Sequence, residues 1–420
     1  MAESRFFRIF IYILVLIFPV LSNLIPHTGS VVLVLLTLAG LPFCFSSKNR
    51  PQISGKEKAV MWAFTVFFAV YLFSFILNGL FGNLEDPRLK YLDHRVRLLF
   101  IIPIFFLLQR VKIEQKVLWY SVCAGAAVAG VYAIISRFWL SPGVRVGGSY
   151  HSIAFGDLTI VMAFMSLAAI NFFRQKHNAY AVIPIAVFLL GAIASLLSGS
   201  KGAWIAFPAF AVIIFFYLGN LISIWPRVLI CITACIVLFS AYNIPGTGVA
   251  ERIQGMKKEL SDYQADHRSK NSIAERMEGW KAAWNIFKQH PFTGAGVGNF
   301  KSIVLRMIDK GERSDIIARY SQPHSLYFYV MAECGIIGLL AILSVFIVPL
   351  WLMFSFARKS YPQRDIAYAG MILIIGFMHF GLTESIFGRN INIGFYVIML
   401  AVVLSNLGIH AGSKRLVENR

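Results

Sequence analysis

Long apolar runs separated by short polar turns make up most of this 420-residue chain. A run of about 20 apolar residues has the length that an α-helix needs to cross the hydrocarbon core of a bilayer. The pattern predicts an all-α, polytopic membrane protein with about twelve transmembrane helices and one large helical loop. The predicted spans are residues 6–25, 30–46, 59–80, 96–109, 117–136, 152–173, 181–197, 203–219, 227–243, 326–354, 366–386 and 391–408.

The spans divide the chain into three parts. Residues 1–244 are expected to hold the first nine transmembrane helices, and residues 324–420 the last three with a cytoplasmic tail. Residues 245–323 form a long polar loop between them. Span 96–109 is shorter than the others, so the sequence leaves open whether it crosses the membrane fully.

The polar loop carries its own helix signals. Residues 250–270 are expected to form an exposed polar helix. Ser272 and Glu275 have the spacing of a capping box, which predicts that a second helix begins at Ser272. That helix is expected to stop at His290, because the residue before a proline, here Pro291, disfavours the helical conformation. The loop is therefore predicted to be an ordered subdomain.

Gly294, Gly296 and Gly298 follow this second helix and resemble a phosphate-cradling loop. No predicted strand precedes them and no Walker lysine follows, so we expect a sharp structural turn and no nucleotide site. Residues 299–320 are expected to return as a further helix. The five cysteines lie in apolar segments without CxxC or Cys/His spacing, so neither a metal site nor a disulfide framework is expected.

The chain is 58% hydrophobic, has a mean hydropathy of +0.68 and carries a formal net charge of +19. Such a charge suggests a protein that binds nucleic acid. The distribution of the Lys and Arg residues along the chain instead indicates the orientation of a membrane protein. With the N-terminus inside, the predicted inside segments hold 18 of the 39 Lys and Arg residues and the short outside loops hold 8. Both termini are therefore predicted to be cytoplasmic and the long loop periplasmic.

The long loop keeps a basic excess of its own, with 13 Lys and Arg against 9 Asp and Glu. A basic surface next to a bilayer attracts anionic lipid headgroups. Solvated helix faces explain the same charges equally well.

Three basic side chains near the outer ends of predicted helices are candidates for chemistry. His324 is expected in the first turn of the helix after the loop, where the helix dipole disfavours imidazolium and keeps the ring available as a base. Arg276 lies on the capped helix, and its planar guanidinium suits phosphate oxygens. Lys201 lies in the short turn 198–202, where glycines let backbone N–H groups and the ammonium approach one anion.

Each candidate also has a simpler explanation. An interfacial hydrogen bond accounts for His324, and a position at the membrane interface accounts for Lys201. An ion pair with Glu275 or Glu278 accounts for Arg276.

Ionisable residues inside or at the ends of the predicted spans are costly in hydrocarbon and usually face a bundle interior. Glu384 and Arg389 are expected to pair across the outer end of a helix hairpin, either structurally or in substrate binding. His151, beside the glycine-rich turn 147–150, is a second candidate for the base. The other such residues are Asp157, Glu333 and His379, and a further basic wall is expected from His94, Arg95 and Arg97.

Three stretches resemble the bacterial O-antigen ligases and the related polymerases. Ser198-Gly199-Ser200-Lys201-Gly202-Ala203-Trp204 is similar to their SxSRGxW outer turn, with lysine where the family usually has arginine. Arg276, Trp280 and Trp284, then His290-Pro291-Phe292 and the glycine turn, resemble their long periplasmic loop. Pro323-His324-Ser325-Leu326-Tyr327 with Ala332-Glu333-Cys334-Gly335-Ile336-Ile337-Gly338 resembles their closing signature.

The resemblance implies a glycosyltransferase of the bacterial inner membrane with its site on the periplasmic face. It would ligate an O-antigen polysaccharide, carried on undecaprenyl pyrophosphate, to the lipid A–core oligosaccharide, with inversion and without metal, nucleotide or other cofactor. His324 would accept the acceptor proton, and Arg276 and Lys201 would bind the pyrophosphate. Loss of the bidentate arginine fork makes the role of Lys201 the weaker assignment.

Other functions fit parts of the same pattern. An O-antigen polymerase uses the same donor with a lipid-linked glycan acceptor. A protein O-oligosaccharyltransferase is usually longer than this chain. A transporter or lipid flippase tends to show two similar halves with charges near the midplane, whereas here no halves repeat and the polar candidates lie at one face.

Overall fold

The computed structural model describes residues 5–45, 53–80, 90–225 and 249–418, with residues 227, 228, 232, 239, 242 and 243 between the last two ranges. Every regular element in these ranges is a helix, which confirms the predicted all-α class. The predicted span 227–243 lies outside the described residues apart from those isolated positions.

Nine helices of the described ranges are long and apolar enough to cross a membrane, so the protein is a multi-pass membrane protein. They are α1 (Arg5–Leu24), α2 (Thr28–Phe45), α3 (Gly55–Leu80), α6 (Gln115–Ile135), α9 (Val182–Ser198), α10 (Lys201–Leu218), α15 (Leu326–Ala357), α16 (Gln363–Thr383) and α17 (Asn390–Glu418).

Two predicted spans fold as shorter helices. Span 96–109 becomes a 3-10 turn (Arg97–Phe100) and α5 (Ile101–Val111), and span 152–173 becomes α7 (Ser152–Leu167) and α8 (Ile170–Arg174). Most residues of α5 and α7 are buried. Helices α2 and α17 pack on α5, and α9 and α16 pack on α7. A short helix is stable at membrane depth when protein rather than lipid surrounds its ends. Because α5 and α7 are too short to count as full spans by length, the total of twelve spans stays a prediction.

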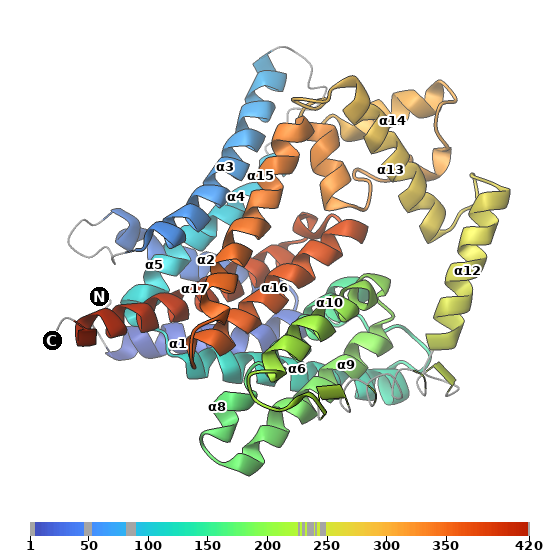
Figure 1. Cartoon of the computed structure of the whole chain (residues 1–420). Coiled ribbons are helices and arrows are strands. Elements are labelled where there is room, and N and C mark those ends of the chain that lie inside the picture. The colour runs from blue at the N-terminus through green and yellow to red at the C-terminus, as the bar shows by residue number, and fades with distance from the viewer. Residues whose placement is uncertain are drawn as a thin grey trace.

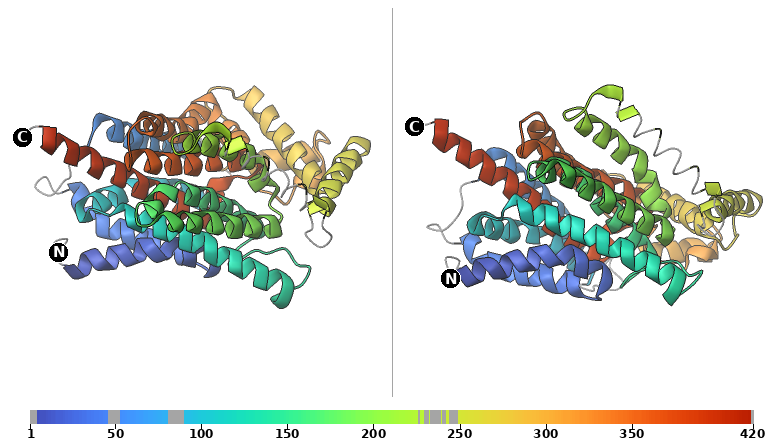
Figure 2. Two further views of the ribbon diagram at one scale, coloured as in Figure 1. Left: turned by 60° about the horizontal axis from the view of Figure 1, so that its bottom comes forward. Right: turned by 90° about the horizontal axis from the view of Figure 1, so that it is seen from below.

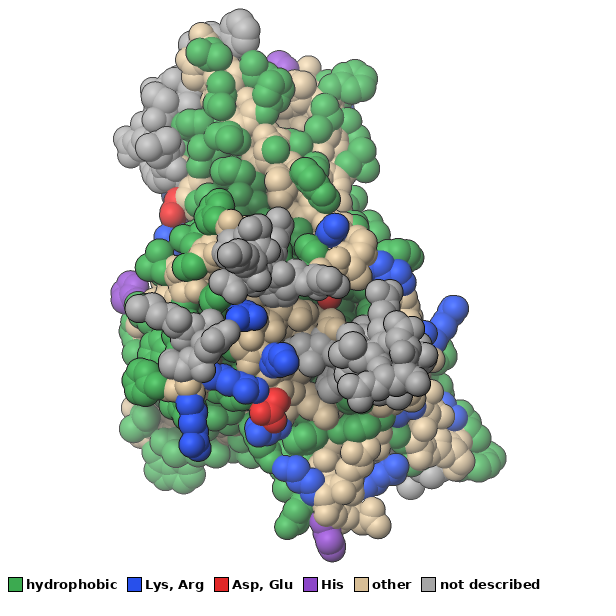
Figure 3. Space-filling view, turned by 90° about the vertical axis from the view of Figure 1, so that its left-hand side faces the viewer, with side chains coloured by type: hydrophobic (Ala, Val, Ile, Leu, Met, Phe, Trp, Pro, Cys, Tyr) green, Lys and Arg blue, Asp and Glu red, His purple; other side chains and the backbone are tan. Residues whose placement is uncertain are grey.

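The bundle is built around α17, in which an 18-residue apolar window of Asn390–Gly408 is 94% buried. Figures 1 and 2 show the two labelled termini on one side and the loop helices on the opposite side. The side with the termini carries a concentration of Lys and Arg side chains, whereas apolar side chains dominate elsewhere in the same view (Figure 3).

The polar loop folds as α12 (Val249–Ala265), α13 (Ser272–Gln289) and α14 (Phe300–Asp309), followed by a 3-10 turn (Asp315–Ile317). Helix α13 stops at Gln289, as Pro291 predicts, but the predicted return helix is shorter than expected and ends at Asp309. The capping box is wrong. Asn271, not Ser272, caps α13, because its Oδ1 accepts hydrogen bonds from the backbone N–H groups of Ile273 and Ala274, 3.1 and 2.8 Å away.

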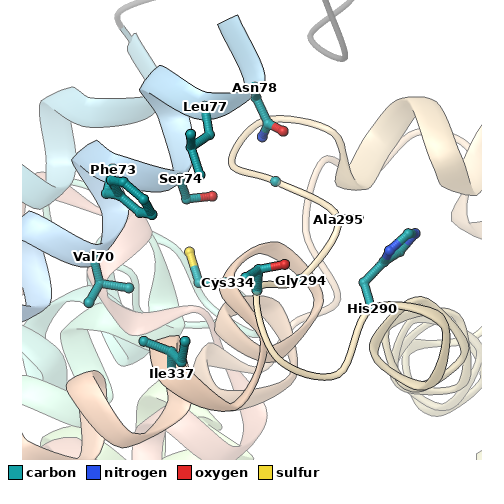
Figure 4. A pocket seen from close by; sticks show the side chains of 12 residues that line it. Val70, Phe73, Ser74, Leu77, Asn78, His290, Gly294, Ala295, Cys334 and Ile337 are labelled. Carbon is teal, nitrogen blue, oxygen red and sulfur yellow. The ribbon is translucent and has the colours of Figure 1, made fainter. Parts of the chain in front are cut away.

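A break inside α15 joins this loop to the bundle. Gly335 has φ 64° and ψ −156°, which interrupts the helix and frees backbone groups on both sides. The segment 291–296 takes up those groups, passing between Asn78 of α3 and Cys334 of α15 in Figure 4. The glycine turn is therefore structural, as predicted. The backbone bonds run from Ala295 N to Ala332 O (2.9 Å), Gly296 N to Glu333 O (2.9 Å), Ile336 N to Pro291 O (2.8 Å) and Ile337 N to Phe292 O (3.5 Å).

Substituting Gly335 should destabilise the protein more than substituting a glycine that also has a positive φ but has no neighbouring atoms at the Cβ position. A Cβ at Gly335 would lie 2.3 Å from the Phe292 carbonyl oxygen, whereas Gly311, also at positive φ, has open space around it. We expect Gly335→Ala to cost about 3 kcal/mol and Gly311→Ala about 1 kcal/mol. Thermal unfolding in detergent measures both variants, and equal losses would show that the contact with the loop contributes nothing.

Candidate functional site

His324 lies where the loop meets the bundle. Its φ of 53° places it in the left-handed region, and α15 begins two residues later, with Ser325 as its N-cap. The predicted position in the first helical turn is therefore wrong, and the helix-dipole argument for a neutral ring does not apply as stated. The ring meets the edge of Tyr320 at 4.6 Å between centroids, and the side chain is 19% exposed.

Glu384 faces His324 from the end of α16. Its carboxylate oxygen Oε1 lies 3.8 Å from His324 Nδ1 and 4.0 Å from Arg389 Nη2, so the predicted pairing with Arg389 is present at the limit of ion-pair distance. Gln322 Nε2 donates to the same oxygen at 3.4 Å. Because 3.8 Å is too long for a hydrogen bond, His324 Nδ1 is buried without a hydrogen-bond partner among the described residues.

The charge of Glu384 is maintained by these neighbours. The side chain is only 4% exposed, and burial acts to raise the pKa of its carboxyl. His324, Arg389 and Gln322 together outweigh burial and lower that pKa below its ordinary value. The site therefore holds a carboxylate beside an imidazole, the arrangement that orients a histidine acting as a base.

Arg276 reaches the same end of α16. Its Nε donates to the Thr383 carbonyl at 3.2 Å, and its Nη1 donates to Ser272 Oγ at 2.9 Å. The simpler explanation of an intrahelical ion pair is wrong, because Glu275 bonds with Arg319 and Tyr320. No carboxylate in the described ranges pairs with Arg276.

The two acidic neighbours of Arg276 are both engaged elsewhere in the loop. Glu278 accepts from Tyr263 at 2.7 Å and pairs with Lys281 at 3.2 Å. Glu275 accepts from Tyr320 at 2.6 Å and contacts Arg319. Arg276 is therefore held by neutral oxygens and keeps its positive charge uncompensated.

Lys201 is the first residue of α10, whose N-cap is Ser200. Its ammonium binds both carboxylate oxygens of Glu259 on α12, at 3.3 and 3.2 Å. The next residue packs on the end of α16, because a Cβ at Gly202 would lie 2.9 Å from Thr383 Oγ1. Thr383 therefore contacts both the Lys201 turn and Arg276, and Glu384 follows it with His324.

Two arginines that the sequence did not single out complete the cluster. Arg145 donates from Nε to Ser198 O at 3.0 Å and from Nη2 to Gly199 O at 3.1 Å. Arg252 of α12 lies on the same turn, 3.0 Å from the position a Gly199 Cβ would take. Burial first, then the charges of Arg252 and Arg276, lowers the pKa of the Arg145 guanidinium. Neither arginine is marked by a motif, so only the fold reveals them.

His151 and Asp157 lie next to this cluster with structural bonds of their own. His151 caps α7, and its Nδ1 accepts from the Ile153 backbone at 3.2 Å. Burial, then the charges of Arg389 and Arg145, lowers the pKa of its imidazole. Asp157 is buried and accepts from Ser200 Oγ at 2.7 Å, which supports the cap of α10.

The remaining polar candidates support the fold. Glu333 is buried, where its Oε1 accepts from the Gly298 backbone at 2.9 Å. His379 Nδ1 lies 2.8 Å from the Ile375 carbonyl of its own helix. Arg95 is buried against the Tyr71 and Tyr329 rings, with 4.9 and 5.3 Å to their centroids. Arg97 pairs with Asp93 at 3.0 Å, so the predicted outer basic wall does not form from these residues.

Residues 186–343 match the family model described as O-antigen ligase. This match supports the O-antigen ligase family for the segment. The segment contains Lys201, Arg276 and His324 of the sequence prediction. Arg145 and Glu384 lie outside the matched segment and reach the site through the fold.

The whole chain is also similar to a protein of Haemophilus influenzae. The two are 22% identical over 409 residues, which cover 96% of this chain and all of that protein. That relative is described as an uncharacterized protein, so the family segment alone bears on activity.

The lowered pKa of Glu384 makes a prediction about stability and pH. A carboxyl whose pKa is lower in the folded state stabilises the protein above its unfolded pKa, and this contribution is lost as pH falls through the folded pKa. Glu384→Gln should therefore unfold at a lower temperature than wild type near pH 7, and the gap should narrow below about pH 4.5.

Thermal unfolding at pH 7 and pH 4 measures that gap. The exposed Glu312→Gln is the control, since its carboxylate lies away from the His324 cluster. A gap for Glu384→Gln that stays the same at both pH values would contradict a charged carboxylate at this position.

Proposed function

We propose that this protein is the glycosyltransferase that ligates undecaprenyl-pyrophosphate-linked O-antigen polysaccharide to the lipid A–core oligosaccharide. The proposal rests on a cluster of cations beside the His324–Glu384 pair. The segment that matches the O-antigen ligase family model contributes His324, Arg276 and Lys201 to this site. The proposal places this cluster on the periplasmic face of the bacterial inner membrane, with both termini in the cytoplasm. The charge distribution of the sequence supports that orientation.

The cations support a multiply charged leaving group. Arg145, Arg252 and Arg276 have no paired carboxylate in the described ranges, and like charges held together in this way are unfavourable without an anion. A pyrophosphate supplies that anion, and arginine forks match its oxygens. Lys201 joins them once Glu259 is displaced from its ammonium.

The proposed reaction is a single displacement. An acceptor hydroxyl gives its proton to His324, and its oxygen bonds to the anomeric carbon of the donor glycan from the face opposite the pyrophosphate. The carbon–oxygen bond to pyrophosphate breaks, and the electron pair leaves with the phosphate oxygen. The configuration at the anomeric carbon is therefore inverted, and Arg276 stabilises the negative charge that grows on the leaving group.

Glu384 acts through His324 in this proposal. Because Oε1 of Glu384 lies nearest to Nδ1, a proton on Nδ1 would face the carboxylate and leave Nε2 to take the acceptor proton. The carboxylate also stabilises the imidazolium that forms. Arg389 keeps Glu384 ionised and is a positioning residue.

Loss of the base or of the phosphate ligand should remove activity without removing the protein. In an in vitro ligation assay with a purified undecaprenyl-linked glycan, His324→Ala should lose nearly all turnover. Arg276→Ala should lose about 100-fold, as expected for a group that stabilises transition-state charge. The exposed loop arginine in Arg268→Ala is the matched control and should keep wild-type turnover. Near-wild-type turnover by correctly inserted His324→Ala would overturn the base assignment.

The acceptor is tested in cells. A strain lacking this protein should make lipopolysaccharide with no attached O-antigen, while the lipid-linked polymer accumulates, because only the final transfer is blocked. Gel analysis of lipopolysaccharide reads the result. Single-unit attachment in that strain would instead assign the protein as an O-antigen polymerase.

A further inference from the structure

A cavity of about 550 Å³ lies between the beginnings of α1 and α6. Its polar wall is made by Arg5, Arg8 and Lys116, with one acidic residue, Glu114. Lys116 lies in the first turn of α6, whereas Arg145 and His151 follow the other end of that helix. The cavity is therefore separate from the candidate active site, and neither the family segment nor the proposed reaction uses it.

The charges around this cavity do not cancel. Glu114 pairs with Lys116 at 2.8 Å, which leaves two arginines without a carboxylate in the described part of the chain. Lys176 adds a further cation beside the cavity wall, with its ammonium 4.9 Å from the centre of the Tyr120 ring. The site therefore favours an anion.

Arg8 is held in place for such a ligand. Its Nη2 donates to Tyr12 Oη at 3.2 Å, and the Tyr12 hydroxyl donates in turn to the Lys112 carbonyl at 2.7 Å. The guanidinium carbon lies 5.5 Å from the Tyr12 ring centroid. A cation fixed in this way loses less conformational freedom when it binds an anion.

The rest of the cavity is apolar and lies along one helix face. Ile9, Ile13 and Leu16 follow one another at helical spacing on α1, leading away from the arginines over roughly 10 Å. Ile9 and Ile13 are 47% and 48% exposed, so this groove is open to the surroundings of the bundle. In a membrane-spanning helix those surroundings are lipid chains.

We propose that this cavity binds an anionic glycerophospholipid, with its phosphodiester against Arg5, Arg8 and Lys116 and one acyl chain along Ile9, Ile13 and Leu16. A soluble phosphate uses only the polar wall. A zwitterionic lipid brings its own cation to a wall that already has a positive excess. Basic pockets at the ends of transmembrane helices suit anionic headgroups for the same reason.

The test uses the delipidated full-length protein in detergent. Phosphatidylglycerol should raise its thermal unfolding temperature and remain bound in native mass spectrometry, whereas phosphatidylcholine and inorganic phosphate should do neither. Arg5→Gln with Arg8→Gln should bind phosphatidylglycerol about 30-fold more weakly. Lys58→Gln with Lys359→Gln removes the same charge from exposed positions outside the cavity and should bind it as wild type does.

Two further variants separate this site from general attraction to a basic surface. Glu114→Gln removes the opposing charge and should bind phosphatidylglycerol about fivefold more tightly. Ile13→Trp leaves every charge in place but fills the groove, and should release the lipid. Equal binding of phosphatidylglycerol by the Arg5/Arg8 and Lys58/Lys359 double variants would overturn the proposal. So would an equal rise in thermal unfolding temperature with phosphatidylcholine or with inorganic phosphate.

Discussion

The C-terminal end of α16 is the point on which the proposed site depends. The last carbonyls of a helix have no partner within it and carry the negative end of the helix dipole. Arg276 satisfies the Thr383 carbonyl from the loop subdomain, across 107 residues of sequence. The next residue, Glu384, lies beside His324, so one helix end positions both the proposed phosphate ligand and the proposed base.

The loop and the bundle are also joined through charge. Glu259 of α12 neutralises Lys201, while Asn271, which caps α13, donates to the Glu259 carbonyl at 3.0 Å. The carboxylate thus occupies the place on Lys201 that an anionic ligand would take. A pyrophosphate bound as proposed would compete with this contact between α12 and the bundle. Occupancy of the site would then be linked to the position of α12.

Local signals predicted the parts of this architecture that depend on neighbouring residues. Apolar runs predicted the long helices, and Pro291 predicted the end of α13. The three glycines predicted the turn that contacts Gly335. His324 and Arg276 could be selected from their positions near helix ends and from their chemistry, and their surroundings also resemble a known family.

Features set by distant contacts were not predictable. Asn271 and Ser272 are adjacent and both suit a cap, and the choice follows from the contact of Asn271 with α12. Arg145 and Arg252 lie in ordinary polar stretches and become part of the cluster only because both pack on Gly199. The short α5 and α7 are stable because other helices bury them, which hydropathy along the chain does not register.

A structure of the protein in lipid nanodiscs with undecaprenyl pyrophosphate bound would show directly whether these cations bind the phosphates of the donor. We expect the two phosphates to lie beside His324, among Arg145, Lys201, Arg252 and Arg276, with the Lys201–Glu259 ion pair broken. Phosphates bound elsewhere, with Glu259 still on Lys201, would contradict this expectation.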